Sequence, residues 1–377
     1  MAKLREKNLK ESKGSGYQAI KLRPVLADVA EEAGVAVSTV SAIMRKQKNC
    51  FASKETRQRV LDVAKDLGYY LSPFSPSPRQ EKTNLIALIL PNLAAPHITM
   101  AKFATIEEMA RDQGYRALIG THQNKSGREE NYIREFLQAR ADGFIIYPTG
   151  QELKSNEKSN SELIKEMVRQ RMPLVLIESP FDFEAPNVSV DRELGCYLQV
   201  KHLVSDVGCK KLAFLCMETS KCIEGQKKLA GYKKALQEAG LRFEDQYFGE
   251  IEKLEQNWFE AGEILGRQLV ESGVDFDGVV LASDNLAPGV IRQLNKAGKS
   301  IPQDVAVIGF DDEDFTPFLS VPLSTIHQPR DVGVWAFNLL LKQLKNNNNI
   351  NLSELQVLLK PELVVRESTK SKGISNE

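Results

Sequence analysis

The sequence predicts an all-α helix-turn-helix head near the N-terminus, followed by a larger α/β region with parallel strands. Residues 26–45, LADVAEEAGVAVSTVSAIMR, have the pattern of two short helices joined by a tight corner. From Asn84 onward, short continuous apolar runs alternate with amphipathic segments, as in parallel strands that are buried on both faces. The 377 residues exceed one ordinary domain, so we expect two or three.

The predicted head has an apolar face at helical spacing and a polar face opposite it. Gly34 supplies the corner, because glycine adopts the backbone conformations that tight turns need. The residues predicted to form the core of the head are Val29, Ala30, Ala33, Val35, Val40 and Ile43. The residues predicted to meet DNA from the second helix are Val37, Ser38, Thr39, Ser41, Ala42, Arg45 and Lys46. An ordinary amphipathic helix pair is the alternative interpretation of this segment.

Three short motifs carry a family resemblance: Asp28-Val29-Ala30, Ala33-Gly34-Val35 and Thr39-Val40-Ser41. On these motifs the chain resembles, over nearly its whole length, the lac repressor and galactose repressor family of bacterial transcription regulators. A third helix follows in register, with Ser53 as its predicted N-cap and Gly68 as its predicted end. The motifs and the third helix together favour DNA binding over a purely structural helix pair.

The resemblance implies a periplasmic-binding-protein-like core, in which two doubly wound parallel-sheet lobes surround a cleft and the chain crosses between them three times. We expect these crossings near Val190, Gln328 and Asn348. The first lobe would then comprise residues 84–189 and 329–348, and the second lobe residues 190–328 and 349–366. The predicted parts of the chain are a basic, flexible extension (1–24), a helix-turn-helix domain (25–70), a proline-rich linker (71–83), a two-lobed effector-binding and dimerisation domain (84–366) and a polar tail (367–377).

The charge of the chain is unevenly distributed. Residues 1–82 contain 16 Lys and Arg against 9 Asp and Glu, which gives them a net charge of +7. Because the whole chain has a net charge of zero, the remaining residues carry −7. A basic head on an acidic body is typical of a protein that binds the phosphates of DNA.

Two departures from the family pattern concern DNA recognition. Ala42 stands where the family has an arginine, so a bidentate guanine contact from this position is excluded. Relatives have a hinge helix that inserts a leucine into the minor groove, but residues 72–78 read SPFSPSP. Pro76 and Pro78 would each cost a helix about 3 kcal/mol, so we expect an extended linker. Pro78 takes the place of the leucine, and Phe74 is a second candidate wedge.

The effector pocket is expected where loops follow the carboxyl ends of the parallel strands. The resemblance and these loops together give the candidate effector contacts His97, Glu178, Lys228, Asn257, Trp258, Asp284 and Gln328. Lys228 replaces a family arginine and lacks its planar fork. Asp284 has two open interpretations, a ligand contact or a cap of the helix that follows it. Which of Asn257 and Trp258 points inward also stays open.

Other function classes find little support in the sequence. The chain contains no dinucleotide, Walker or nucleophile-elbow motif, and no metal-spaced group of His or Cys, so we expect neither an enzyme nor a cofactor or metal site. The five cysteines are scattered, and no apolar run approaches a membrane span. We expect a cytoplasmic homodimeric repressor that binds a near-palindromic operator and a small-molecule effector, with sugars as the leading class and nucleobases second. A solute-binding protein of a sugar transporter is the alternative, although the basic head and the absence of a signal sequence disfavour it.

Overall fold

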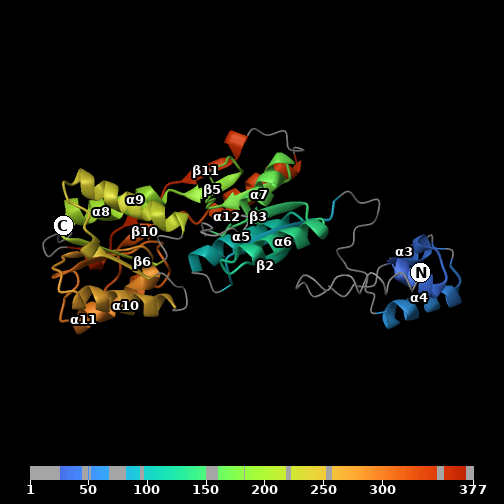
Figure 1. Cartoon of the computed structure of the whole chain (residues 1–377), viewed down its shortest axis with the longest axis horizontal. Helices are drawn as coiled ribbons and strands as arrows, with labels where there is room; N and C mark the ends of the chain where they lie inside the picture. The colour runs from blue at the N-terminus through green and yellow to red at the C-terminus, as the bar shows by residue number, and fades with distance from the viewer. Residues whose placement is uncertain are drawn as a thin grey trace, which may run out of the picture. The chain divides into compact units, whose positions relative to one another are not determined.

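The structure is a computed structural model of the chain, and it separates into two compact units, residues 1–77 and 78–377 (Figure 1). It describes residues 26–44, 50, 52–67, 82–93, 97–149, 160–181, 183–217, 222–251, 257–345 and 352–370. The predictions for the N-terminal extension, for Arg45 and Lys46, and for the linker residues Phe74 and Pro78 lie outside the described residues.

The first unit contains the predicted helix-turn-helix, which is confirmed. Its helices are α2 (Leu26–Ala33), α3 (Val37–Met44) and α4 (Lys54–Asp66). Gly34 has a φ of 64°, the left-handed conformation that the corner between α2 and α3 requires. Ser53 caps α4, because its Oγ accepts a hydrogen bond from the Thr56 N–H at 3.2 Å. The buried core of this unit consists of Val29, Ala30, Ala33, Val40, Ile43, Val60 and Ala64.

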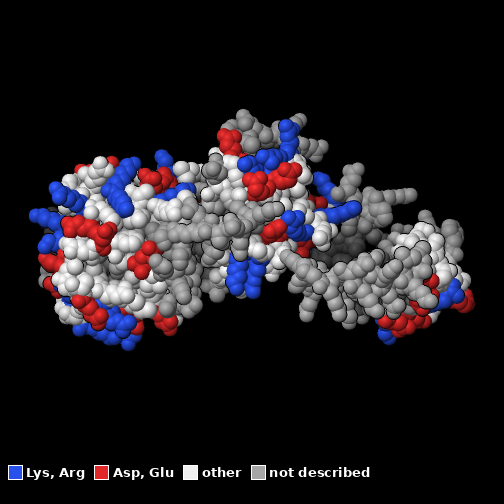
Figure 2. All heavy atoms as spheres, in the orientation of Figure 1, with Lys and Arg blue, Asp and Glu red and all other residues white. Residues whose placement is uncertain are grey.

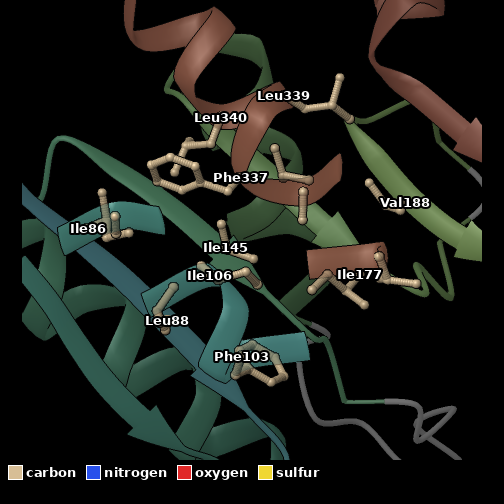
Figure 3. Packing of buried hydrophobic residues seen from close by; sticks show 14 of the residues in the cluster. Ile86, Leu88, Phe103, Ile106, Ile145, Ile177, Val188, Phe337, Leu339 and Leu340 are labelled. Carbon is tan, nitrogen blue, oxygen red and sulfur yellow. The ribbon is translucent and has the colours of Figure 1, made fainter. Parts of the chain in front are cut away.

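The first lobe of the second unit is a six-stranded parallel sheet in the order β11-β5-β4-β3-β1-β2. Its strands are β1 (Leu85–Leu90), β2 (Arg116–Thr121), β3 (Gly143–Ile146), β4 (Leu174–Ile177), β5 (Asn187–Val190) and β11 (Gln356–Leu359). Its helices are α5 (His97–Asp112), α6 (Ser126–Gln138), α7 (Asn160–Arg169) and α12 (Val332–Lys345). Helices α5 and α12 bury one face of the sheet, where Phe103 and Phe337 pack with Leu88 and Ile145 (Figure 3). Helices α6 and α7 bury the other face.

The second lobe has a four-stranded parallel sheet in the order β7-β6-β8-β9, with helices on both faces. Its strands are β6 (Leu212–Met217), β7 (Phe248–Ile251), β8 (Gly278–Leu281) and β9 (Ala306–Ile308), and β10 (Thr325–His327) forms an antiparallel pair with β12 (Glu362–Val364). Its α-helices are α8 (Arg192–Lys201), α9 (Ile223–Glu238), α10 (Trp258–Glu271) and α11 (Ala287–Lys296). Short helical turns in this unit are η1 (His202–Val207), η2 (Asp245–Tyr247), η3 (Asp284–Leu286), η4 (Thr316–Phe318), η5 (Leu352–Leu355) and η6 (Glu367–Thr369).

Helices α8 and α9 pack so closely that one position must be glycine. A Cβ atom added to Gly231 would lie 2.1 Å from the carbonyl oxygen of Glu193. Any other residue at this position would therefore force the two helices apart, and α9 carries side chains that reach the space between the lobes.

The chain passes from the first lobe to the second after β5, returns after β10, and passes a last time between β11 and β12. The predicted crossing near Asn348 is wrong, because β11 pairs with β5 and still belongs to the first lobe. The segment LLKPELVV resembled a single strand of the second lobe. Pro361, which lacks an N–H group, instead separates two strands that pair in different sheets.

The predicted polar tail from residue 367 is also wrong at two of its first residues. Ser368 and Thr369 in η6 are buried in the second lobe. The Ser368 hydroxyl donates a hydrogen bond to the carbonyl oxygen of Val307 at 2.6 Å and accepts one from the Ser324 N–H at 2.8 Å. These bonds satisfy polar side chains that composition alone indicated to be exposed. Within the described residues, no helix is long and apolar enough to cross a membrane.

Candidate functional site

Helix α3 exposes one face to solvent. Val37 is 47% exposed and Ser38 is exposed, whereas Val40 and Ile43 are buried beneath them. The other predicted contacts on this helix that are described, Thr39, Ser41 and Ala42, are partly exposed. The face therefore offers two kinds of contact to a groove, small hydroxyl groups and methyl groups.

A second group of candidate residues lies where the two lobes meet. Glu178 follows β4 in the first lobe, Lys228 lies on α9 after β6, and Gln328 follows β10 at a crossing between the lobes. All three side chains are buried. Glu178 directly follows a strand of the parallel sheet, whereas Lys228 lies within a helix and Gln328 follows a strand of the antiparallel pair.

Glu178 forms a buried ion pair that the sequence did not predict. Its partner is Arg192, the first residue of α8, whose Nη2 lies 3.1 Å from Glu178 Oε1. The same Nη2 lies 3.6 Å from Glu224 Oε2 on α9. Glu224 in turn accepts a hydrogen bond from the hydroxyl of Tyr147, which directly follows β3. Burial and the charge of Glu224 hold the pKa of Tyr147 well above its usual range.

A second chain of hydrogen bonds runs through Gln328. Its Oε1 accepts from Lys102 Nζ of α5 at 3.3 Å, and its Nε2 donates to Asp311 Oδ1 at 2.5 Å. The hydroxyl of Ser283 donates to the other oxygen of Asp311 at 2.7 Å. Lys102 is in the first lobe, whereas Ser283 and Asp311 follow strands β8 and β9 of the second lobe. This chain therefore joins the two lobes through buried polar groups.

Lys228 completes the cluster from α9. Its Nζ donates to the carbonyl oxygen of Ala282 at 2.5 Å and lies 3.9 Å from the ring centroid of Phe310. Burial lowers the pKa of both Lys102 and Lys228, although the negative charge of Asp311 acts in the opposite direction.

Asp284 is fully buried and hydrogen-bonded within the second lobe. One carboxylate oxygen accepts from the Thr325 hydroxyl at 2.7 Å and the other from the Glu313 N–H at 3.0 Å. Ser283, and not Asp284, caps the helical turn η3, so the predicted helix cap is wrong. Burial and neighbouring Asp311 raise the pKa of Asp284 well above its usual range. Both oxygens of Asp284 accept hydrogen bonds within the lobe, and its assignment as a ligand contact stays a prediction.

The N-terminal part of the chain, residues 25–72, matches the family model described as bacterial regulatory proteins, lacI family. Residues 200–369 match the periplasmic binding protein-like domain. The chain belongs to the LacI family. The predicted resemblance and fold class are confirmed, and the match of the head disfavours the alternative of a transporter's solute-binding protein.

Similar proteins cover almost all of this LacI-family chain. The transcriptional repressor PurR of Histophilus somni (strain 129Pt) is 29% identical over 352 residues, which cover 92% of this chain and 99% of that repressor. The structure of the lac repressor dimer bound to operator and the anti-inducer ONPF covers 92% of this chain and 99% of its own, with a TM-score of 0.67 and 23% identity. The complex of the transcriptional regulator CelR with cellobiose covers 92% and 100%, with a TM-score of 0.65 and 22% identity. At these identities the two structures establish the fold.

Three of the predicted effector contacts lie away from the charged cluster of this LacI-family member. His97 is exposed at the start of α5, with its Nδ1 3.4 Å from Asp314 Oδ2. Asn257 caps α10, because its Oδ1 accepts from the Glu260 N–H at 2.8 Å. Trp258 packs against the core of the second lobe. Their observed contacts are structural, and their assignment as effector contacts stays a prediction.

The residues that the sequence analysis missed differ in how visible they were. Tyr147 and Asp311 stand close behind apolar runs, where the strand-end rule points. Lys102 lies within α5 and Arg192 opens α8, and neither has a motif around it. Glu178 and Asp311 also have φ angles of 55° and 121°, in the region that disfavours residues with a side chain. Such strain occurs at functional sites, and in this chain it also occurs at Arg140 and Arg171, outside the cluster.

Proposed function

We propose that this LacI-family protein is a transcriptional repressor whose binding to operator DNA is controlled by a small molecule held between its two lobes. The observation that carries the proposal is the presence of both parts in one chain: an exposed recognition helix, α3, and a buried polar cluster shared by two lobes. The similar proteins named as transcriptional repressors and regulators support it.

On this proposal, α3 enters the major groove through Val37, Ser38, Thr39, Ser41 and Ala42, with Arg45 and Lys46 contacting phosphates. A homodimer places two such helices on a near-palindromic operator, and the lac repressor dimer bound to operator, which has a similar fold, supports this arrangement. The protein acts in the cytoplasm, where its DNA is, and it has no catalytic role.

The effector contacts in this proposal are Glu178, Lys228, Gln328 and Asp311. Their amide, ammonium and carboxylate groups match the hydroxyl groups of a sugar, which donate and accept hydrogen bonds. The cellobiose in the CelR complex makes a sugar the leading class. Nucleobases are the second class.

Capture and sequencing of genomic DNA by the purified full chain would test the DNA-binding half of this proposal. We expect one near-palindromic motif, and we expect its binding to weaken steeply with salt as counterions are released. A chain that begins at Lys82 should keep its fold and lose the motif, since the second unit buries its own cores. Enrichment of the same motif by that shorter chain would refute the assignment of the head.

The face of α3 can be tested with two matched substitutions. Val37→Glu places a negative charge on α3, and Leu61→Glu places the same charge on α4. The two positions are similarly exposed, Val37 at 47% and Leu61 at 42%. We expect Val37→Glu to weaken operator binding by about tenfold or more and Leu61→Glu to have a smaller effect. Equal losses in the two variants would mean that α3 is not the face that reads DNA.

A further inference from the structure

The three cations of the charged cluster between the lobes have N–H groups that donate no hydrogen bond to a described residue. Lys102, Arg192 and Lys228 are only 2%, 4% and 7% exposed. An ammonium group has three N–H donors, yet each lysine makes a single hydrogen bond within the described part of the chain. Arg192 donates from Nε and Nη2, and its Nη1 has no hydrogen bond to a described residue.

The carboxylates of the same cluster are already engaged. Both oxygens of Asp311 accept, from Gln328 and Ser283. Both oxygens of Glu178 accept from Arg192, and Oε1 also accepts from the Val190 N–H. The third carboxylate, Glu224, accepts from Tyr147 through Oε1, and its Oε2 lies 3.6 Å from Arg192. Each carboxylate therefore has a charged or hydroxyl partner, whereas each lysine keeps N–H donors that have no acceptor among the described residues.

The two lysines also differ from Arg192 in their partners. Arg192 has carboxylate oxygens at 3.1 and 3.6 Å, whereas neither Lys102 nor Lys228 has one within 4.0 Å among the described residues. Each ammonium meets instead a neutral oxygen, the amide of Gln328 or the carbonyl of Ala282. A buried charge is costly unless an opposite charge or strong hydrogen bonds compensate it.

The two ammonium groups belong to one hydrogen-bonded network between the lobes. Lys102 donates a hydrogen bond to Gln328, and Gln328 donates one to Asp311. The other oxygen of Asp311 accepts from Ser283, which follows Ala282 in the chain. The carbonyl oxygen of Ala282 accepts from Lys228. On the face of the second unit seen in Figure 2, positive and negative side chains are interspersed.

We propose that the effector of this protein carries an anionic group, a phosphate or a carboxylate, which Lys102, Lys228 and Nη1 of Arg192 bind in the cleft. This inference rests on the proposed control by an effector and specifies its chemical class. An anionic oxygen accepts several hydrogen bonds, and so it matches the N–H donors that the two lysines and Arg192 have left over. A neutral sugar would give the two ammonium groups hydrogen bonds but no opposite charge.

Calorimetric titration of the full chain with inorganic phosphate, at constant ionic strength, would test the charged site directly. We expect phosphate to bind, and Lys102→Gln and Lys228→Gln each to weaken it by about tenfold or more, the loss of one charge-assisted hydrogen bond. Lys228→Arg should retain binding because it keeps the charge. Lys210→Gln, at an exposed lysine of the same lobe, is the matched control and should leave binding unchanged. Thermal unfolding of each variant identifies any that fails to fold.

Absence of phosphate binding by the wild-type chain, or equal binding by all the variants, would overturn the proposal. Operator binding should then be measured with neutral sugars, sugar phosphates and sugar acids, which separates the two anionic sources. If neutral sugars weaken or tighten operator binding as much as the charged compounds do, the anionic effector is rejected and the proposed control by an effector is kept. If no compound changes operator binding while phosphate binds through the two lysines, the anion site stands and the proposed control fails.

Discussion

Tyr147, at the carboxyl end of β3 in the first lobe, donates a hydrogen bond to Glu224, at the start of α9 in the second lobe. Arg192 lies beside Glu224 at the crossing that joins the lobes. The space between the lobes is therefore bridged by the protein's own side chains. A ligand that binds there must exchange its own contacts for some of these, and so it can shift the equilibrium between closed and open lobes.

Tyr147→Phe tests this bridge. The substitution leaves a partly buried carboxylate oxygen of Glu224 without its donor, which costs about 1 kcal/mol and should shift the lobes toward the open arrangement. The expected result is a larger radius of gyration in small-angle X-ray scattering and a lower unfolding temperature. Tyr197→Phe is the matched control, because the Tyr197 hydroxyl donates to Glu238 at 2.7 Å on the exposed surface of one lobe. Similar changes in the two variants would argue against a bridge between the lobes.

Glu178→Gln tests the buried ion pair. Arg192 would keep only Glu224 as a charged partner, and breaking a buried pair typically costs 3–5 kcal/mol of the free energy of unfolding. The exposed pair of Lys342 and Glu354, 2.9 Å apart, gives the control Glu354→Gln, for which we expect about 0–1 kcal/mol. Urea unfolding of both variants measures the difference. A loss for Glu178→Gln as small as that of the control would show that the pair does not stabilise the fold.

Much of the fold follows from the apolar runs of the sequence. LIALIL, GFII, LVLI and GVVL are continuous and apolar because parallel strands are buried on both faces, and they form β1, β3, β4 and β8. Strands β5 and β7, with the sequences NVSV and FGEI, lack this signal because they are short and partly polar. Their strand conformation depends on pairing with neighbours already in place.

The site was less predictable than the fold. Glu178 and Lys228 were predicted from the resemblance together with their place after apolar runs, but the role of Lys102 depends on α5 of one lobe reaching Gln328 between the lobes. A pattern along the chain does not contain that contact. The sequence analysis named Asp284 from the resemblance and did not consider Asp311, which also follows a strand and takes part in the hydrogen bonds through Gln328 and Ser283. Two acidic residues that each follow a strand of one sheet satisfy the same sequence rule, and only their packing in the structure distinguishes them.

The lowered pKa values of Lys102 and Lys228 predict how anion binding depends on pH. Burial makes each lysine lose its proton at a lower pH than an ordinary lysine, so anion binding should weaken as pH rises, before the usual range near 10.5 is reached. Sulfate is a suitable probe because its charge is constant over this range. In Lys228→Arg the guanidinium stays protonated, so the dependence on pH should become weaker. A wild-type affinity that is constant up to the ordinary lysine range would contradict the prediction.

Asp284→Asn should reveal a cost that the carboxylate imposes on the second lobe. Burial and Asp311 raise the pKa of Asp284 in the folded chain above its ordinary value of 3.8, so folding favours the protonated form. The stability contributed by this group is present below that ordinary value and is lost as pH rises toward the raised pKa, at about 1.4 kcal/mol for each pH unit between the two values.

Asparagine does not ionise, so the unfolding temperature of Asp284→Asn should exceed that of the wild type by a margin that grows as pH rises from acid toward neutral. The amide can still accept from the Glu313 N–H and donate to the Thr325 hydroxyl, which keeps both contacts satisfied. Asp245→Asn, at an exposed carboxylate of the same lobe, is the control and should show no such margin. Thermal unfolding over a pH series measures both variants. A variant less stable than the wild type at every pH would mean that the ionised carboxylate of Asp284 stabilises the lobe.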